Sequence, residues 1–165
     1  MSDEYTDYES NIISNVQEHG WFCTYVFDPD GEDPGFSYST GFTESLNCPE
    51  FIIFGLDRKL MHSMLWKIFR DIKSGVVPHD ERIWSELLDG FDCVIRKVHP
   101  ENIPMNYLNS ARWFWNTHLG KSELLEAYQV VWPGAVSGEF PWDEGCDPYI
   151  IEMQPPLYLS GLPKY

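Results

Sequence analysis

The side chains most able to do chemistry lie in a block of hydroxyl groups and at an acid that follows a proline. Tyr38 and Thr40 alternate with Ser39, so a strand would place their two hydroxyls on one face. Gly41 would let a ligand or a second backbone come close, although a packing role within the sheet is the simpler explanation. Glu50 precedes an apolar run, where burial without a partner would raise its pKa as a general acid needs. A salt bridge at a strand start is the alternative for Glu50.

Other catalytic and ligand-binding signatures are weak or missing in the sequence. His19 stands at a predicted helix end, where its imidazole could stabilise the last carbonyls or act as a general base. Cys48 has no positive neighbour in sequence to lower its pKa, and no Gly-x-Ser-x-Gly motif occurs. The five histidines lie far apart and no Cys-x-x-Cys pair is present. We therefore predict no metal site, no cofactor and no enzyme with a complete catalytic signature.

The charge of the chain is large and unevenly distributed. The 165 residues contain 11 Lys and Arg against 26 Asp and Glu, a net charge of −15. Residues 1–57 carry twelve acids and no Lys or Arg, residues 58–121 carry ten bases, and residues 122–165 carry seven acids and a single Lys. Such a field repels phosphates and attracts basic proteins. We predict a basic protein partner and no direct nucleic-acid binding; acidity that serves only solubility is the simpler alternative.

The composition fits a folded chain in the cytoplasm. Hydrophobic residues make up 43% and aromatic residues 16%, enough for a core. The longest apolar run, Phe51–Leu56, is far below the roughly 20 residues that span a bilayer. The acidic start of the chain does not resemble a secretory signal, and the four isolated cysteines are expected to be reduced. We predict no membrane association, and the oligomeric state is not predicted.

Periodicity predicts the elements that must position these residues. Thr6 and Glu9 form a capping box for a helix at about 6–19, and Asp57 can cap a second helix over 58–74. Strands are predicted by the aromatic and β-branched runs at 21–27, 36–42, 51–56, 91–98 and 126–132. A weaker helical turn at 80–89, a helix at about 105–118 and a short strand at 149–153 complete the prediction.

No internal repeat or linker divides the chain, so one domain over 1–165 is expected, with an irregular C-terminal segment at 133–165. Strands that are partly neighbours and partly separated by single helices favour the α+β class. We predict a mixed or mainly antiparallel sheet of five to six strands with about three helices.

Several separated blocks resemble a bacterial family of domains of unknown function, DUF4262. They are His19-Gly20-Trp21, the stretch 36–42, the stretch 49–56, and the closing blocks at 128–133, 138–142 and 154–157. The resemblance covers about residues 15–157. The family usually has a histidine before the Pro-Glu pair, whereas this chain has Cys48. The family name implies no activity.

Two function classes follow from these observations. The favoured class is a non-enzymatic acidic binding protein, in its sharpest form a partner or decoy of a basic bacterial or phage protein. The competing class is a small-ligand binder or enzyme whose pocket is formed by the family-like blocks. Its candidate residues are His19, Trp21, Tyr38, Thr40, Glu50, Gln129 and Trp142. Buried polar groups in these blocks must pair internally or be offered to a ligand.

Overall fold

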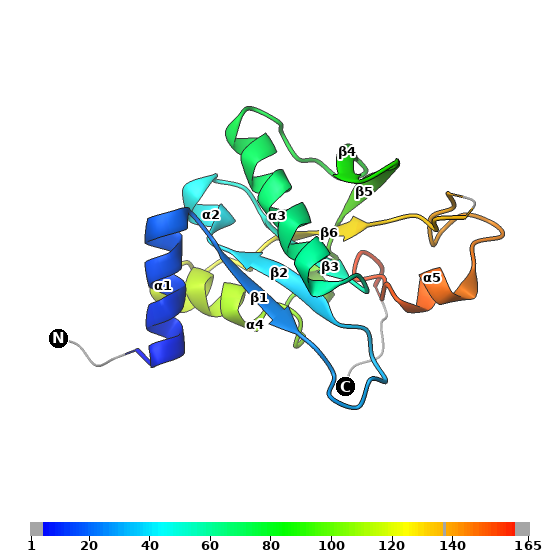
Figure 1. Ribbon diagram of the computed structural model, residues 1–165. Coiled ribbons are helices and arrows are strands. Elements are labelled where there is room, and N and C mark those ends of the chain that lie inside the picture. Colours follow the sequence, from blue (N-terminus) through cyan, green and yellow to red (C-terminus); the bar gives the residue numbers. More distant parts are fainter. Residues whose placement is uncertain (1–4, 137, 161–165) are drawn as a thin grey trace.

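The computed structural model describes residues 5–136 and 138–160, which contain a six-stranded sheet (Figure 1). The strand order is β1-β2-β3-β6-β5-β4. The strands β3 and β6 are parallel, and the other neighbouring pairs are antiparallel. The bounds are β1 Phe22–Val26, β2 Phe36–Thr40, β3 Glu50–Phe54, β4 Ile83–Leu88, β5 Phe91–Lys97 and β6 Ala127–Val131. The predicted α+β class with a mixed, mainly antiparallel sheet is confirmed.

The two longest helices begin where their capping residues predict. The helices are α1 Asp7–His19, α2 Phe42–Ser45, α3 Arg58–Lys73, α4 Asn109–Arg112 and α5 Pro148–Glu152, with a 3₁₀ turn η1 Pro100–Asn102 and a π-helix η2 Trp113–His118. Thr6 and Glu9 form the predicted capping box of α1, and Gly20 ends that helix in the left-handed region. The Asp57 carboxylate accepts from the backbone N–H groups of Lys59 and Leu60 at the start of α3.

The prediction of a helical turn at 80–89 is wrong, because this segment forms the strand β4. Ile83 and Leu87 recur at helical spacing, which favoured the helix. In the structure β4 pairs with β5, and the register shifts between Trp84 and Leu88 around Glu86, which has a φ of 68°. A bulge of this kind breaks the alternation by which a strand is recognised in sequence.

Two predictions in the second half of the chain also need correction. The predicted strand at 149–153 is the helix α5, since Asp147 accepts from Tyr149 N as N-cap and Pro148 occupies the first turn. The helix predicted at about 105–118 begins only after Leu108, which has a φ of −129°, and continues as a π-helix from Trp113. The predicted irregular segment 133–165 therefore contains α5, and its residues 137 and 161–165 lie outside the described residues.

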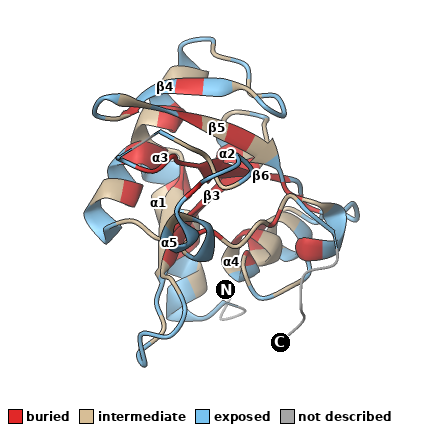
Figure 2. Cartoon of the chain, turned by 90° about the vertical axis from the view of Figure 1, so that its right-hand side faces the viewer, coloured by how far each residue is buried: buried red, intermediate tan, exposed pale blue. Residues whose placement is uncertain are grey.

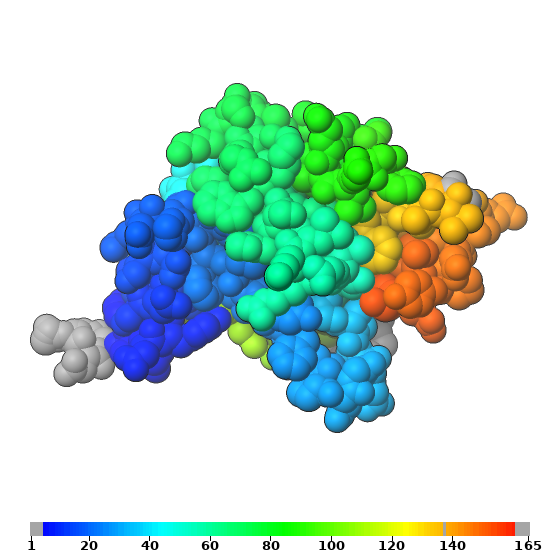
Figure 3. Space-filling model, viewed as in Figure 1, coloured from blue at the N-terminus to red at the C-terminus, as the bar shows by residue number. Residues whose placement is uncertain are grey.

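Both faces of the sheet are covered (Figure 2). On one face Met61, Leu65 and Ile68 of α3 pack in one cluster with the central strands. On the other face α4 and the C-terminal segment pack in a second cluster around Ile52. Figure 3 shows α3 across the front and the C-terminal segment beside the end of β6. Because β3 and β6 are central, side chains at the start of β3 are buried from both sides.

A third cluster joins α1 to η2 through Ile12, Val16 and Phe114. Cys23, Cys48, Cys93 and Cys146 are free thiols, as predicted. None of the helices in the described part of the chain combines the length and apolar composition needed to cross a bilayer.

Candidate functional site

The carboxylate of Glu50 is the most unusual group in the interior. Glu50 is the first residue of β3, and its exposed fraction is 0%. Its Oε1 accepts from Ser39 Oγ at 2.7 Å and from Phe42 N at 3.1 Å. Its Oε2 accepts from Gly41 N at 2.8 Å, Thr43 N at 3.4 Å and Thr43 Oγ1 at 3.3 Å. These hydrogen bonds join Glu50 to residues 41–43, so that the segment 41–50 forms a closed ring of chain.

Local sequence explains why these donors converge. Gly41 has a φ of 109°, which turns the chain so that the N–H groups at the start of α2 point at the carboxylate. A Cβ at Gly41 would meet Val16 Cγ2 at 2.8 Å, so a side chain does not fit there. The Ser39 hydroxyl accepts from Phe51 N at 2.9 Å, which leaves its proton for Glu50.

Burial sets the acidity of this region. It raises the pKa of Glu50 to about 7, against the opposing effect of the hydrogen bonds from Ser39 and the backbone of 41–43. Burial, and secondarily the nearby Glu50, raises the pKa of the Cys48 thiol to about 12. Cys48 is therefore a protonated thiol at neutral pH and a poor nucleophile. The salt bridge considered for Glu50 is absent from the ion pairs of the described residues, where neutral donors take its place.

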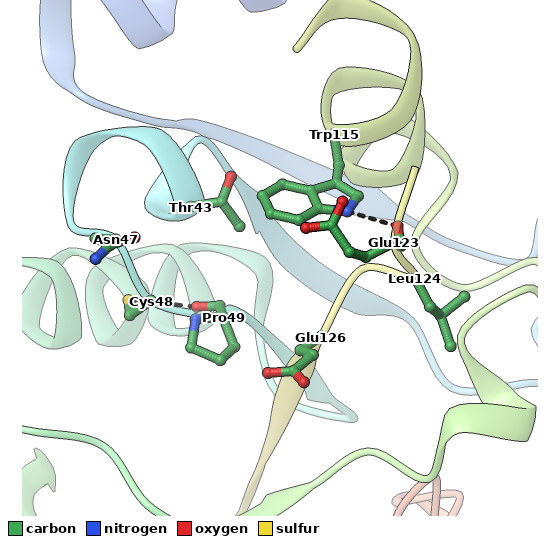
Figure 4. A pocket seen from close by; sticks show the side chains of 8 residues that line it. All are labelled: Thr43, Asn47, Cys48, Pro49, Trp115, Glu123, Leu124 and Glu126. Carbon is green, nitrogen blue, oxygen red and sulfur yellow. Dashed lines mark hydrogen bonds between the residues drawn. The ribbon is translucent and has the colours of Figure 1, made fainter. Parts of the chain in front are cut away.

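A pocket lies directly beyond this ring of chain (Figure 4). Its volume is about 310 Å³, at the small end of the range for ligand sites. It is lined by Thr43, Asn47, Cys48, Pro49, Trp115, Glu123, Leu124 and Glu126. Four of these residues come from the loop that Glu50 closes, and Thr43 touches both Glu50 and the pocket. The shape of this wall therefore depends on the Glu50 carboxylate.

The opposite wall is held by η2. Figure 4 shows the indole of Trp115 across the pocket from Cys48 and Pro49. Trp115 Nε1 donates to Glu123 O at 2.8 Å, and Asn116 Nδ2 donates to the same oxygen at 3.1 Å. These bonds fix the segment that carries Glu123 against a π-helix, a rare form that is frequent at functional sites. The lining of the pocket thus combines an aromatic ring with two acidic side chains, Glu123 and Glu126.

Two lysines contact the groups that line this pocket. Lys97 Nζ lies 3.6 Å from Glu126 Oε2, and Lys121 Nζ lies 5.8 Å from the centre of the Trp115 ring. Both Lys97 and Glu126 are about half-exposed, at 49% and 62%. A pair this exposed contributes little to stability, so a competing cation can replace Lys97.

None of the seven residues predicted from the sequence lines this pocket. Tyr38 and Gln129 flank Ile52 on neighbouring strands, and their side chains bond to separate segments. Tyr38 OH accepts from Ser110 N at 3.0 Å. Gln129 donates to Pro155 O at 2.8 Å and accepts from Leu157 N at 2.9 Å. These two residues hold neighbouring segments against the sheet.

The remaining predicted residues occupy four different environments. Trp21 is buried against Phe42 and other aromatic rings of the α3 cluster. Thr40 is buried, and its hydroxyl has no hydrogen-bond partner among the described residues. His19 is half-exposed at the end of α1, 3.9 Å from the carboxylate of Glu18. Trp142 is 43% exposed and stacks on Phe140.

Sequence analysis missed most of the pocket. Thr43, Trp115, Glu123 and Glu126 belong to no motif, and more than 70 positions separate the first of them from the others. Only Glu50, behind the wall, was among the candidate residues. In residues 5–136 and 138–160, no three His, Cys, Asp or Glu side chains gather as metal ligands do.

Comparison with known proteins identifies the family and nothing beyond it. The model of a domain of unknown function, DUF4262, matches residues 15–147, which is most of the chain. Neither the search of curated proteins nor the search of solved structures found a match. The motif blocks around His19, Tyr38 and Glu50 fall inside the matched region. This chain therefore belongs to the DUF4262 family.

Proposed function

We propose that this protein is a non-enzymatic binding protein that recognises a basic protein partner and seats one cationic side chain in the Trp115 pocket. The observation that carries the proposal is a pocket lined by the Trp115 indole together with the acidic side chains of Glu123 and Glu126, with the Glu123 carboxylate next to the indole in Figure 4. A lysine or arginine side chain would lay its apolar stem on the indole and its charge near the carboxylates.

The contacts already present at the pocket support this chemistry. Lys121 approaches the Trp115 ring and Lys97 approaches Glu126, so each wall attracts an ammonium group within the protein itself. The net charge of −15 adds a long-range field that draws basic partners and repels phosphates. We therefore propose a protein partner, and neither nucleic acid nor a membrane, within the bacterial cytoplasm.

An enzyme or small-ligand binder built from the family-like blocks is the second candidate. The observation in its favour is the pKa of about 7 at Glu50, which suits a general acid. However, the carboxylate is fully buried and does not line the pocket. A binding role needs no direct contact with Glu50, so the geometry supports it better.

Binding of defined peptides tests the proposal. A blocked lysine-rich peptide, its arginine counterpart and an uncharged norleucine counterpart are titrated into the protein in a calorimeter. The pocket variant carries Glu123→Gln and Glu126→Gln. The matched control carries Glu32→Gln and Asp33→Asn in the exposed loop after β1, which removes the same charge. A pull-down from lysate at low and high salt then searches for the natural partner.

We expect the two cationic peptides to bind with an affinity that falls steeply with salt. The pocket variant should bind about tenfold more weakly than the loop control, which corresponds to about 1.4 kcal/mol. An equal loss in both variants would mean that only the net charge matters. Equal binding of the norleucine peptide would also contradict the proposal.

A further inference from the structure

Glu50 is a buried acid whose described contacts include no positive charge. Its five hydrogen bonds come from neutral hydroxyl and backbone donors. The ion pairs among the described residues involve other acids. Buried charges in proteins are usually paired, because an isolated charge away from water is costly. The ionised form of Glu50 is therefore short of a counter-charge.

The pocket is the place from which a counter-charge can act. Thr43 separates the carboxylate from the pocket and contacts both. Attraction between opposite charges is stronger across the protein interior than through water, and only the partly buried Thr43 separates the fully buried Glu50 carboxylate from the pocket. A cation bound against Thr43 would stabilise the ionised carboxylate through that wall.

The other charged groups around Glu50 do not supply this positive charge. Cys48, two positions before it, is a thiol, and Glu44 on α2 is an acid. Glu126 accepts from Glu50 N through its backbone oxygen at 3.1 Å, and Tyr128 follows on β6. The ammonium group of Lys97 is paired with Glu126 and not with Glu50.

We infer that binding of a cationic side chain in the Trp115 pocket is coupled to ionisation of Glu50. The bound cation favours the carboxylate, and the carboxylate favours the bound cation, because such coupling is reciprocal. The proton leaves the Glu50 carboxyl group for the buffer, and no other bond is made or broken. This inference rests on the proposed function and adds to it a dependence on pH.

The coupling acts near neutral pH. Burial raises the pKa of Glu50 to about 7, so about half of the unbound molecules carry the proton at that pH. A tenfold coupling would lower the pKa of Glu50 by about one unit in the complex. Binding at about pH 7 would then release roughly 0.4 of a proton per molecule, and affinity would rise as the pH rises through neutrality.

Calorimetry measures this proton directly. The lysine-rich peptide is titrated into the protein at about pH 7 in phosphate and in Tris, which differ in ionisation enthalpy. We expect the observed heat to depend on the buffer for the unmodified protein and for the control Glu32→Gln, an exposed change in the loop after β1 that leaves both Glu50 and the pocket intact. Glu50→Gln should bind with no such dependence and with a flat pH profile.

A second measurement keeps the inference testable if Glu50→Gln does not fold. Carbon NMR follows the titration of the Glu50 carboxyl group in the unmodified protein with and without peptide. We expect its midpoint to fall by about one unit when the peptide is bound. Peptide binding with an unchanged midpoint and no proton release would overturn the coupling and leave the proposed function standing. An absence of binding at every pH would overturn both.

Discussion

Two regions of the sheet bury polar side chains in opposite ways. Along β6 and the C-terminal segment beside it, the amides of Gln129 and Gln154 each donate to and accept from the backbone. Gln154 accepts from Trp132 N at 3.0 Å and donates to Trp132 O at 2.9 Å. At the start of β3, Glu50 accepts from five donors and borders a pocket.

The difference separates a structural use of buried polarity from a functional one. A neutral amide that donates and accepts can be fully satisfied by the chain, and both glutamines fasten the C-terminal segment to the sheet. A carboxylate that meets only donors has its hydrogen bonds but not its counter-charge. We expect changes at the glutamines to alter stability at every pH, and changes around Glu50 to alter both stability and binding in a pH-dependent way.

The largest loss of stability is expected from a substitution at Gly41, in the turn whose N–H groups donate to Glu50. Gly41→Ala places a methyl group 2.8 Å from Val16 Cγ2 and 3.1 Å from Gly20 O at a φ of 109°. Strain and overlap together should lower the free energy of unfolding by ~4 kcal/mol. The control Gly31→Ala has a φ of 71° and no atom within 4 Å, so it should cost only ~1 kcal/mol. Urea unfolding measures both, and equal losses would contradict the packing argument.

The second effect is the pH dependence that Glu50 gives to stability. Its pKa is about 7 in the folded protein, above the ordinary value of 4.5 expected when unfolded. Between these values the folded state binds more protons, so the free energy of unfolding should fall as the pH rises from 4.5 to about 7. Relative to Glu50→Gln, the fall should total ~3 kcal/mol. Parallel pH profiles for the two proteins would show that Glu50 does not titrate in this range.

A smaller loss of stability is expected at Gln129, one of the two buried amides of the comparison. Gln129→Leu removes the partners of Pro155 O and Leu157 N, which should lower the free energy of unfolding by ~2 kcal/mol. Because the lost group is neutral, the loss should be the same at each pH. The exposed Gln17→Leu is the control. A loss that varies with pH would mean that the two regions are not independent.

Local patterns predicted most of the fold. The capping box of α1, the Asp57 cap of α3 and the apolar run of β3 each act within a few residues of themselves. The errors arose where a distant partner decides the structure. The bulge of β4 depends on its pairing with β5, and the helix α5 replaced a strand that its apolar residues favoured.

The candidate site was less predictable, because a pocket joins segments that only tertiary packing brings together. The burial of Glu50 was predictable from its place before an apolar run, and its partners were not, since they lie in the backbone of 41–43. Glu126 meets the loop before β3 because β6 pairs with β3 in parallel, and Trp115 reaches the same pocket from η2. Tyr38 and Gln129 were correctly placed on strands, yet the hydrogen bonds of each are internal.

The smallest expected effect tests whether the pocket attracts cations by charge. Lys97→Gln removes the ammonium group that lies 3.6 Å from Glu126 Oε2, and an exposed pair of this kind should change the free energy of unfolding by less than ~0.5 kcal/mol. Affinity for the lysine-rich peptide should nevertheless rise about twofold to threefold, because Glu126 is freed and a repelling charge is lost. Lys59→Gln, an exposed change on α3 with the same effect on net charge, is the control and should raise affinity less. Calorimetry at low salt compares the two variants. An equal rise in both would assign the attraction to the overall charge of the molecule, and a fall in Lys97→Gln would mean that Lys97 helps to form the pocket.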